Sequence, residues 1–280
     1  MKKVVPLRAM TKISRNLIFR YSLCFIFIVL LTGCKSEFEQ VRTSGEPERI
    51  YEKAMEYYEL EDYSKAISLM EIILSSYRGT TKGEDLYFKY AQANYNQGLY
   101  ISAANLYETF STSFPTSQKR EEADFMAAYS YYLLSPNYRL DQDYTLKAID
   151  AFQLFVNTFP NSDRVDESNT LIDDLRKKLE KKRLEEARLY ANLQQYEAAV
   201  QVMENLLKDF PETQNAEEIR HLIVQAQYNL AANSVYEKQK ERFTKTNEMA
   251  EAFISRYPNS IYLKEVEKYL TVSSNKIKEL

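Results

Sequence analysis

Phe159-Pro160-Asn161-Ser162 recurs along the chain with small changes, and this recurrence determines the fold. Proline cannot continue the interior of a helix, and a Ser or Thr two residues later can cap the next helix. Each copy therefore predicts the end of one helix, a turn and the start of another. The other copies, the last of them degenerate, are Phe114-Pro115-Thr116-Ser117, Phe210-Pro211-Glu212-Thr213, Tyr257-Pro258-Asn259-Ser260 and Tyr77-Arg78-Gly79-Thr80.

Small and aromatic residues stand at fixed distances before these turns. A small residue permits close contact between helices, and an aromatic one precedes it by a nearly constant interval. The copies therefore share a second helix of fixed length, while the first helix and its loops vary. The residues twelve positions before the proline position are Ala66, Ala103, Ala148, Ala199 and Thr246. The aromatic residues near the start of the same helices are Tyr63, Tyr100, Tyr144, Tyr196 and Phe243.

This pattern resembles the tetratricopeptide repeat, a helix-turn-helix unit of roughly 34 residues that stacks into a superhelix. Chance spacing of core residues is the alternative, but all the copies agree in register. One unit cannot bury its apolar face alone, so we expect a continuous array. The sequence predicts an all-α fold, a right-handed solenoid of about five tetratricopeptide-like helix pairs plus a C-terminal capping helix.

The expected helices divide the mature chain into two sets of repeats. Residues 47–162 hold repeats 1–3 and residues 163–280 hold repeats 4–5 and the capping helix. The charged run 180–186 continues an apolar stripe and is interpreted as part of a long solvated helix. The expected helix pairs are 47–60 with 63–77, 83–96 with 100–114, 120–134 with 143–159, 164–193 with 196–210, and 215–236 with 243–257, before a last helix at 261–280.

Residues 1–33 are predicted to be a lipoprotein signal peptide. The first twenty residues carry six cations and no acidic residue, and the apolar run from Leu23 to Leu31 is too short to span a bilayer. Small residues then precede Cys34, which we expect to become the lipid-modified first residue of the mature chain. The alternative is an uncleaved anchor with a free cysteine. Residues 34–46 lack periodic apolar positions and are predicted to be a lipidated tether.

Composition favours a helical, non-enzymatic protein. The chain has only 5 glycines, no Trp, and 40 acidic against 37 basic residues, six of which lie in the predicted signal peptide. The acidic mature chain has no general attraction to nucleic acid or anionic lipid, so the lipid supplies the membrane contact. We expect no cofactor and no metal site. The one histidine, His221, lies in an amphipathic pattern and is interpreted as a packed or surface residue, and the glycines form no phosphate-binding loop.

The segment from Ser135 to Thr145 is more specific than a generic repeat. It holds a Pro-containing loop with Asp141-Gln142, followed later by a long helix. Together with the lipidation motif, the length and the five repeats, it resembles the BamD family of outer-membrane β-barrel assembly lipoproteins. The chain departs from the family pattern in two places. Arg78-Gly79 replaces the proline of the first repeat, and residues 235–243 extend the last one.

The resemblance implies a non-enzymatic, lipid-anchored subunit that faces the periplasm at the outer membrane. Its partners would be the periplasmic domains of BamA, other assembly-machine subunits and unfolded outer-membrane β-barrel proteins, but no nucleic acid. The C-terminal half would dock on BamA, with plausible charged contacts that could equally be ordinary surface salt bridges. These contacts are Arg176, Lys177, Arg183 and Arg188.

The first three repeats are expected to bind the precursor. In tetratricopeptide solenoids the first helices line the concave side, and aligning the copies on Ala54, Ala91 and Ala128 directs one set of aromatic residues toward it. Gln92 and Asn96 could hydrogen-bond an extended peptide. The predicted groove aromatics are Tyr51, Tyr58, Phe88, Tyr95, Phe125, Tyr129 and Tyr132. Those assigned to the core are Tyr57, Tyr90 and Tyr131.

Two other functions share parts of this pattern. A periplasmic tetratricopeptide scaffold for cell-envelope division or transport would use the same aromatic-Pro turns but would not need the Asp141-Gln142 loop. A glycan-binding lipoprotein of the helical-repeat type usually presents Trp platforms, and this chain has no Trp.

Overall fold

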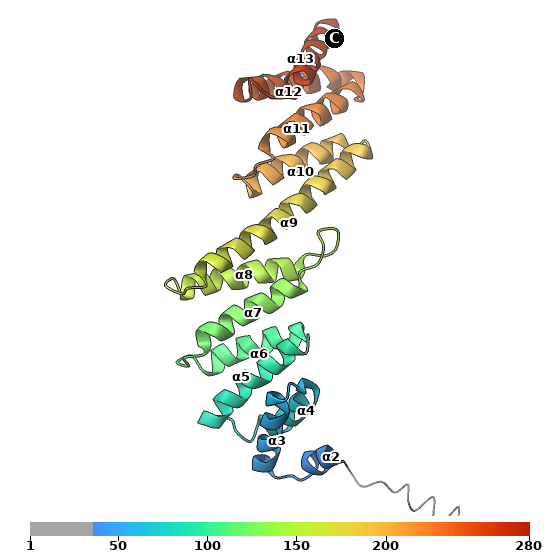
Figure 1. Cartoon of the computed structure of the whole chain (residues 1–280). Coiled ribbons are helices and arrows are strands. Elements are labelled where there is room, and N and C mark those ends of the chain that lie inside the picture. The colour runs from blue at the N-terminus through green and yellow to red at the C-terminus, as the bar shows by residue number, and fades with distance from the viewer. Residues whose placement is uncertain (1–35) are drawn as a thin grey trace, which may run out of the picture. The chain divides into compact units, whose positions relative to one another are not determined.

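The structure, a computed structural model, describes residues 36–280, and it is helical without a strand over that range. The predicted all-α class is confirmed. The described residues form two compact units, which divide between Gln97 and Gly98. Figure 1 shows the helices in chain order. The predicted signal peptide and Cys34 lie outside the described residues.

The first unit consists of α2 (Glu37–Arg42), α3 (Pro47–Glu59), α4 (Tyr63–Ile73) and α5 (Thr81–Asn96). Its core joins α3, α4 and α5, and it also contains Val41 of α2. The predicted tether is therefore wrong in part, because α2 is a short helix packed on the first repeat. Phe38 lies with its ring centroid 6.0 Å from that of Tyr57, and Val41 follows one turn later on the same face.

The second unit is a series of helices, each packed against the next in the chain. These are α6 (Tyr100–Ser113), α7 (Arg120–Leu134), α8 (Asp143–Thr158), α9 (Val165–Asn192), α10 (Tyr196–Asp209), α11 (Ala216–Ala232), α12 (Tyr236–Arg256) and α13 (Leu263–Glu279).

The predicted small positions explain how the helices approach each other. Ala66, Ala103, Ala148, Ala199 and Thr246 are all fully buried. The one polar member, Thr246, satisfies its hydroxyl by donating to the carbonyl of Arg242 at 2.9 Å. The second helices also end where the sequence predicts, since Phe114, Phe159 and Phe210 are the C-terminal caps of α6, α8 and α10.

The long helix α9 belongs to two apolar cores. Ile172 and Leu175 of its first half pack with residues of α7 and α8. Leu184 and Ala187 of its second half pack with residues of α10 and α11. At 28 residues the helix is about 42 Å long, so the charged run is helical as predicted, and one rigid element connects repeat 3 to repeat 4.

Three helix boundaries differ from the prediction by four residues or more, one of them the end of α11, which lies at Ala232 rather than at 236. Helix α4 ends at Ile73 rather than at 77, because Ser75 and Ser76 favour turns and Gly79 adopts a φ of 78°. Helix α12 begins at Tyr236 rather than at 243. Its extra charged residues are good helix formers, and they add two turns ahead of the buried Phe243.

Candidate functional site

Tyrosines of α3 and lysines of α5 form a continuous strip in the first unit, which we call the tyrosine strip: Tyr51, Tyr58, Lys82, Lys89 and Gln92. The ammonium nitrogens of Lys82 and Lys89 each lie 5.2 Å from a ring centroid, that of Tyr51 and of Tyr58 respectively. The Tyr58 hydroxyl donates to Gln92 Oε1 at 2.6 Å. The two tyrosines are seven residues apart, and so are the two lysines, so the same contact recurs after two turns of each helix.

One end of the tyrosine strip is fixed by a charged cluster. The Tyr77 ring centroid lies 5.3 Å from that of Tyr51, and the Tyr77 hydroxyl donates to Glu48 Oε2 at 2.8 Å. Burial and the neighbouring carboxylate raise the pKa of Tyr77 to about 12. Glu48 also pairs with Lys82. The hydrogen bonds that Glu48 accepts from Lys82 and from Tyr77 lower the pKa of its carboxyl. Tyr77 therefore remains a neutral donor near neutral pH.

Two predicted groove aromatics are wrong. Phe88 and Phe125 are only 5% and 3% exposed. Phe125 packs against Phe152 and Phe155 of α8, with ring centroids 5.8 and 5.5 Å apart. These rings belong to the core, because a phenylalanine has no hydroxyl that requires water.

The other predicted groove residues are partly or fully accessible. Tyr95 is half-buried and Asn96 is exposed, both on α5. In the second unit Tyr129 stacks on Tyr132 with ring centroids 5.6 Å apart, on the accessible side of Phe125. The predicted groove thus has six residues in the first unit and three in the second. Of the tyrosines assigned to the core, Tyr131 is buried, whereas Tyr57 and Tyr90 are partly buried against the core of the first unit.

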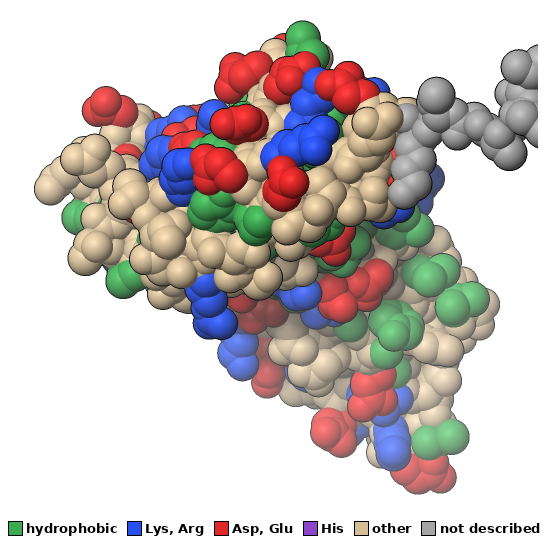
Figure 2. All heavy atoms as spheres, turned by 90° about the horizontal axis from the view of Figure 1, so that it is seen from below, with side chains coloured by type: hydrophobic (Ala, Val, Ile, Leu, Met, Phe, Trp, Pro, Cys, Tyr) green, Lys and Arg blue, Asp and Glu red, His purple; other side chains and the backbone are tan. Residues whose placement is uncertain are grey.

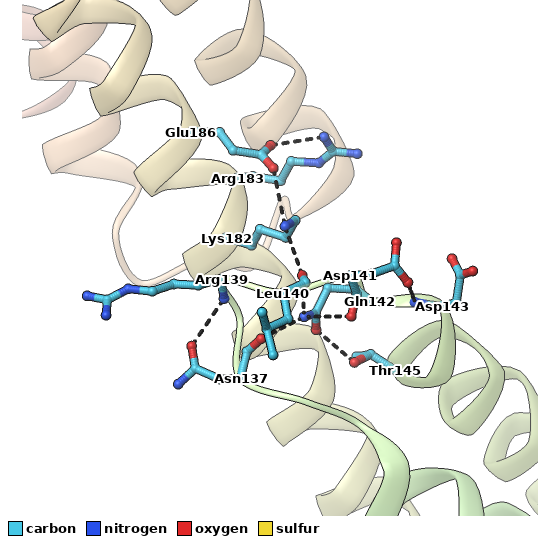
Figure 3. A network of polar contacts seen from close by, with 10 residues as sticks. All are labelled: Asn137, Arg139, Leu140, Asp141, Gln142, Asp143, Thr145, Lys182, Arg183 and Glu186. Atoms are coloured by element: carbon cyan, nitrogen blue, oxygen red, sulfur yellow. Dashed lines mark hydrogen bonds and ion pairs between the residues drawn. The ribbon is translucent and has the colours of Figure 1, made fainter. Parts of the chain in front are cut away.

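The loop between α7 and α8 is fixed by Gln142 (Figure 3). This side chain is 6% exposed, and its amide nitrogen donates to the carbonyls of Asn137 and Leu140 at 3.0 and 2.9 Å. Its amide oxygen accepts from the buried Thr145 hydroxyl at 2.7 Å. Gln142 thus explains why Asp-Gln-x-x-Thr has this spacing: the glutamine closes the loop and the threonine orients the glutamine.

Two lysines of α9 fasten the loop from outside. Lys178 donates to Ser135 Oγ at 2.6 Å. Lys182 donates to the carbonyl of Leu140 at 3.1 Å, as Figure 3 shows. Burial lowers the pKa of Lys178. The sequence prediction missed both lysines, although their i,i+4 spacing places them on one face of α9. The Leu140 side chain remains exposed at the tip of the loop.

The four predicted docking cations lie on α9, and each is paired within the chain. Arg176 bonds Glu212 at 2.8 Å, Arg183 bonds Glu186 at 3.2 Å, and Lys177 lies 3.6 Å from Asp174. Arg188 pairs with Glu185 at 2.9 Å and also with Glu218. Acidic and basic side chains are similarly interspersed on the face drawn in Figure 2. Exposed pairs of this kind are worth about 0–1 kcal/mol, so exchange for a partner's carboxylates costs little.

His221 is a packed residue. Its ring stacks on Tyr262 with centroids 4.3 Å apart, and Nε2 lies 3.0 Å from Glu265 Oε2 of α13. Within residues 36–280, no group of three or more His, Cys, Asp or Glu side chains could hold a metal ion. No helix in the same range is long and apolar enough to cross a membrane.

Comparison with known proteins identifies the family. Over residues 43–242 the chain matches the family described as "YfiO: Outer membrane lipoprotein". It is 26% identical over 228 residues to the outer membrane protein assembly factor BamD of Pasteurella multocida (strain Pm70), covering 76% of this chain and 87% of that protein. It is 22% identical over 198 residues to BamD of Rickettsia prowazekii (strain Madrid E), covering 71% and 79%.

Among solved structures, the tetratricopeptide domain of P58(IPK) matches 90% of this chain and 72% of that chain, with 14% identity and a TM-score of 0.40. The family match covers most of the chain and extends from the segment before α3 into the first turns of α12. The two relatives confirm the resemblance to BamD. The chain therefore belongs to the YfiO family of outer membrane lipoproteins.

Proposed function

We propose that this protein is a non-enzymatic subunit of the machine that assembles β-barrels in the outer membrane. It holds unfolded barrel precursors on its first repeats and docks through its C-terminal repeats on BamA. The family membership and the name of the two relatives, assembly factor BamD, support the assembly role.

The tyrosine strip is the observation that carries the precursor site. Unfolded barrel strands alternate apolar and polar residues and commonly end in an aromatic residue. Half-buried tyrosines offer such strands a large apolar contact while their hydroxyls remain hydrated. A chain that ends in an aromatic residue also ends in a carboxylate, and the ammonium groups of Lys82 and Lys89 lie beside the rings, where exposed pairs with Glu48 and Glu59 can be exchanged at little cost.

Lipidation of Cys34 would place this strip at the membrane surface. The diacyl or triacyl group formed at such a cysteine is sufficient for stable anchoring. We expect Cys34→Ala to leave the protein in the soluble fraction. Recovery of that variant from washed outer membranes of cells that lack the partner subunits would contradict a single covalent attachment.

The precursor site is tested with a fluorescent peptide that corresponds to the last strand of an outer-membrane barrel. Replacing both Tyr58 and Tyr95 with Ala should weaken its binding more than tenfold, about 1.4 kcal/mol, as measured by anisotropy. Tyr58→Phe keeps the ring and loses the hydroxyl that bonds Gln92, so its effect should be smaller. Tyr190→Ala removes a partly exposed tyrosine of α9 outside the strip and is the matched control.

Circular dichroism of each variant separates a lost site from a lost fold. If the double variant keeps its helical content and binds the peptide as tightly as the unmodified protein, neither the tyrosine strip nor Tyr95 belongs to the precursor site.

A further inference from the structure

An open groove lies between α10, α11 and α12, far along the chain from the tyrosine strip. Its volume is about 700 Å³. The floor is apolar and consists of Leu207, Ile223, Val224, Met249 and Phe253. Three cations stand around this floor, Lys208 of α10, Arg220 of α11 and Arg256 of α12, together with one acidic residue, Glu204. The groove therefore combines an apolar floor with a rim of net positive charge.

The rim cations differ from the four predicted docking cations of α9, each of which is paired with a carboxylate within the chain. Among the described residues, no carboxylate forms an ion pair with Lys208, Arg220 or Arg256. The buried Nε of Arg220 has no hydrogen-bond acceptor there either. By contrast, Arg176 and Arg188 are paired with Glu212 and Glu218. A buried donor without an acceptor costs free energy, which an incoming carboxylate would recover.

The positive rim belongs to this groove alone among the equivalent junctions of the second unit. Aligning the repeats on their turn prolines gives the residues that correspond to Lys208, Arg220 and Arg256. At the junction of α8, α9 and α10 they are Asn157, Asn169 and Asp209, and at that of α6, α7 and α8 they are Thr112, Asp124 and Thr158. Repeat architecture requires the apolar floor at every junction, but it does not require the cations.

We propose that this groove binds an acidic amphipathic helix of a partner protein. Charge complementarity selects an acidic segment, and the apolar floor selects one with an apolar face. The occupant is a helix rather than a strand because a helix satisfies its own backbone groups, whereas the groove lining holds no Asn or Gln side chain, such as Gln92 of the tyrosine strip, that could bond an extended backbone. The groove uses none of the α9 docking cations, and this inference does not depend on the proposed precursor site.

Site-specific photo-crosslinking in cells tests the proposal with the full-length lipoprotein. A benzophenone amino acid at Ala252, which lines the groove, should give a protein adduct, and the adduct peptide identified by mass spectrometry should be an acidic segment with helical periodicity. The matched control is Leu154, which occupies the corresponding position of α8 and is also exposed. We expect the same adduct to be absent there.

A synthetic peptide of the crosslinked segment then supplies an affinity. Lys208→Glu combined with Arg220→Glu should weaken its binding to the purified protein at least tenfold without loss of helical content. Reversal of Arg176 should leave that affinity unchanged. An adduct formed only with lipid or with a second copy of this chain would overturn the proposal. A crosslinked segment that is basic or strand-forming would also overturn it, as would a peptide affinity that the double reversal leaves unchanged. Vesicles of anionic phospholipid, tested by flotation with the same variants, identify the lipid case.

Discussion

The ammonium group of Lys182 donates to the backbone carbonyl of Leu140 at 3.1 Å, so the loop between α7 and α8 is bonded directly to α9. The same carbonyl accepts from the Gln142 amide at 2.9 Å. A loop that carries an exposed leucine at its tip is thereby held from two sides. The motif that distinguishes the third repeat thus acts as a structural brace between repeat 3 and the long helix.

Gln142→Ala should destabilise this brace. The substitution removes the bonds of the buried Gln142 amide to the carbonyls of Asn137 and Leu140 and to the Thr145 hydroxyl, and each such bond typically contributes about 0.5–1.5 kcal/mol to the free energy of unfolding. Urea unfolding followed by circular dichroism measures the loss. Asp150→Ala, at an exposed position of α8, should change the free energy by less than about 0.5 kcal/mol. Equal midpoints for the two variants would show that Gln142 does not brace the loop.

Ala103→Phe should be disruptive because Ala103 is fully buried at a close contact between helices. Overpacking of such a position typically costs about 1–3 kcal/mol. The melting temperature of the variant should therefore fall. Asn105→Phe places the same ring at an exposed site of the same helix and is the control. An unchanged melting temperature for Ala103→Phe would contradict the close helix contact.

The stabilisation that Glu265 of α13 gives the folded chain should weaken in acid. The Tyr269 hydroxyl, which donates to Glu265 at 2.6 Å, is the main cause that lowers the pKa of the Glu265 carboxyl, with His221 contributing further. Because folding lowers this pKa, the ionised carboxyl stabilises the folded chain near neutral pH, and this stabilisation is lost as the pH falls through the folded-state pKa.

Glu265→Gln tests this pH dependence. We expect the unmodified protein to be the more stable of the two at about pH 7, and the difference to shrink toward about pH 3. Thermal melts across this range measure it. A stability difference that stays constant with pH would argue against a role for the charge of Glu265.

Reversing Arg176 and Arg188 to Glu should reduce co-purification of the barrel subunit if α9 is the docking face. The substitutions also break the internal pairs with Glu212 and Glu218, so a second variant separates the two effects. Arg176→Glu combined with Glu212→Arg restores one internal pair while keeping the reversed charge on α9. Loss of the partner in both variants supports docking. Undiminished co-purification in both would identify the α9 cations as ordinary surface pairs.

The repeat signal predicted the helices well because proline and small residues act locally, and their spacing does not depend on distant partners. The same reasoning could not assign each aromatic side chain. Tyr51, Phe88 and Phe125 occupy one repeat position, yet both phenylalanines are buried in the core while the tyrosine remains partly accessible. Periodicity specifies the face of a helix, but packing against the neighbouring helices decides how deep that face lies.

A similar limit applies to the charged run of α9. Lys177 and Arg183 were predicted as contacts, whereas their neighbours Lys178 and Lys182 bond the loop. Adjacent residues of a helix differ in direction by about 100°. Only the position of the loop, set by the tertiary structure, determines which lysine reaches it.

The shared helix α9 also constrains how this family can change length. Its Leu175 belongs to one core and its Leu184 to the next. A single residue inserted between them would rotate the second core by about 100° against the first and shift it by about 1.5 Å. The registers of both cores survive only insertions or deletions close to whole turns, such as seven residues. The length of this segment can therefore change only in steps of whole helical turns, whereas the loops at the turn prolines can gain or lose residues one at a time.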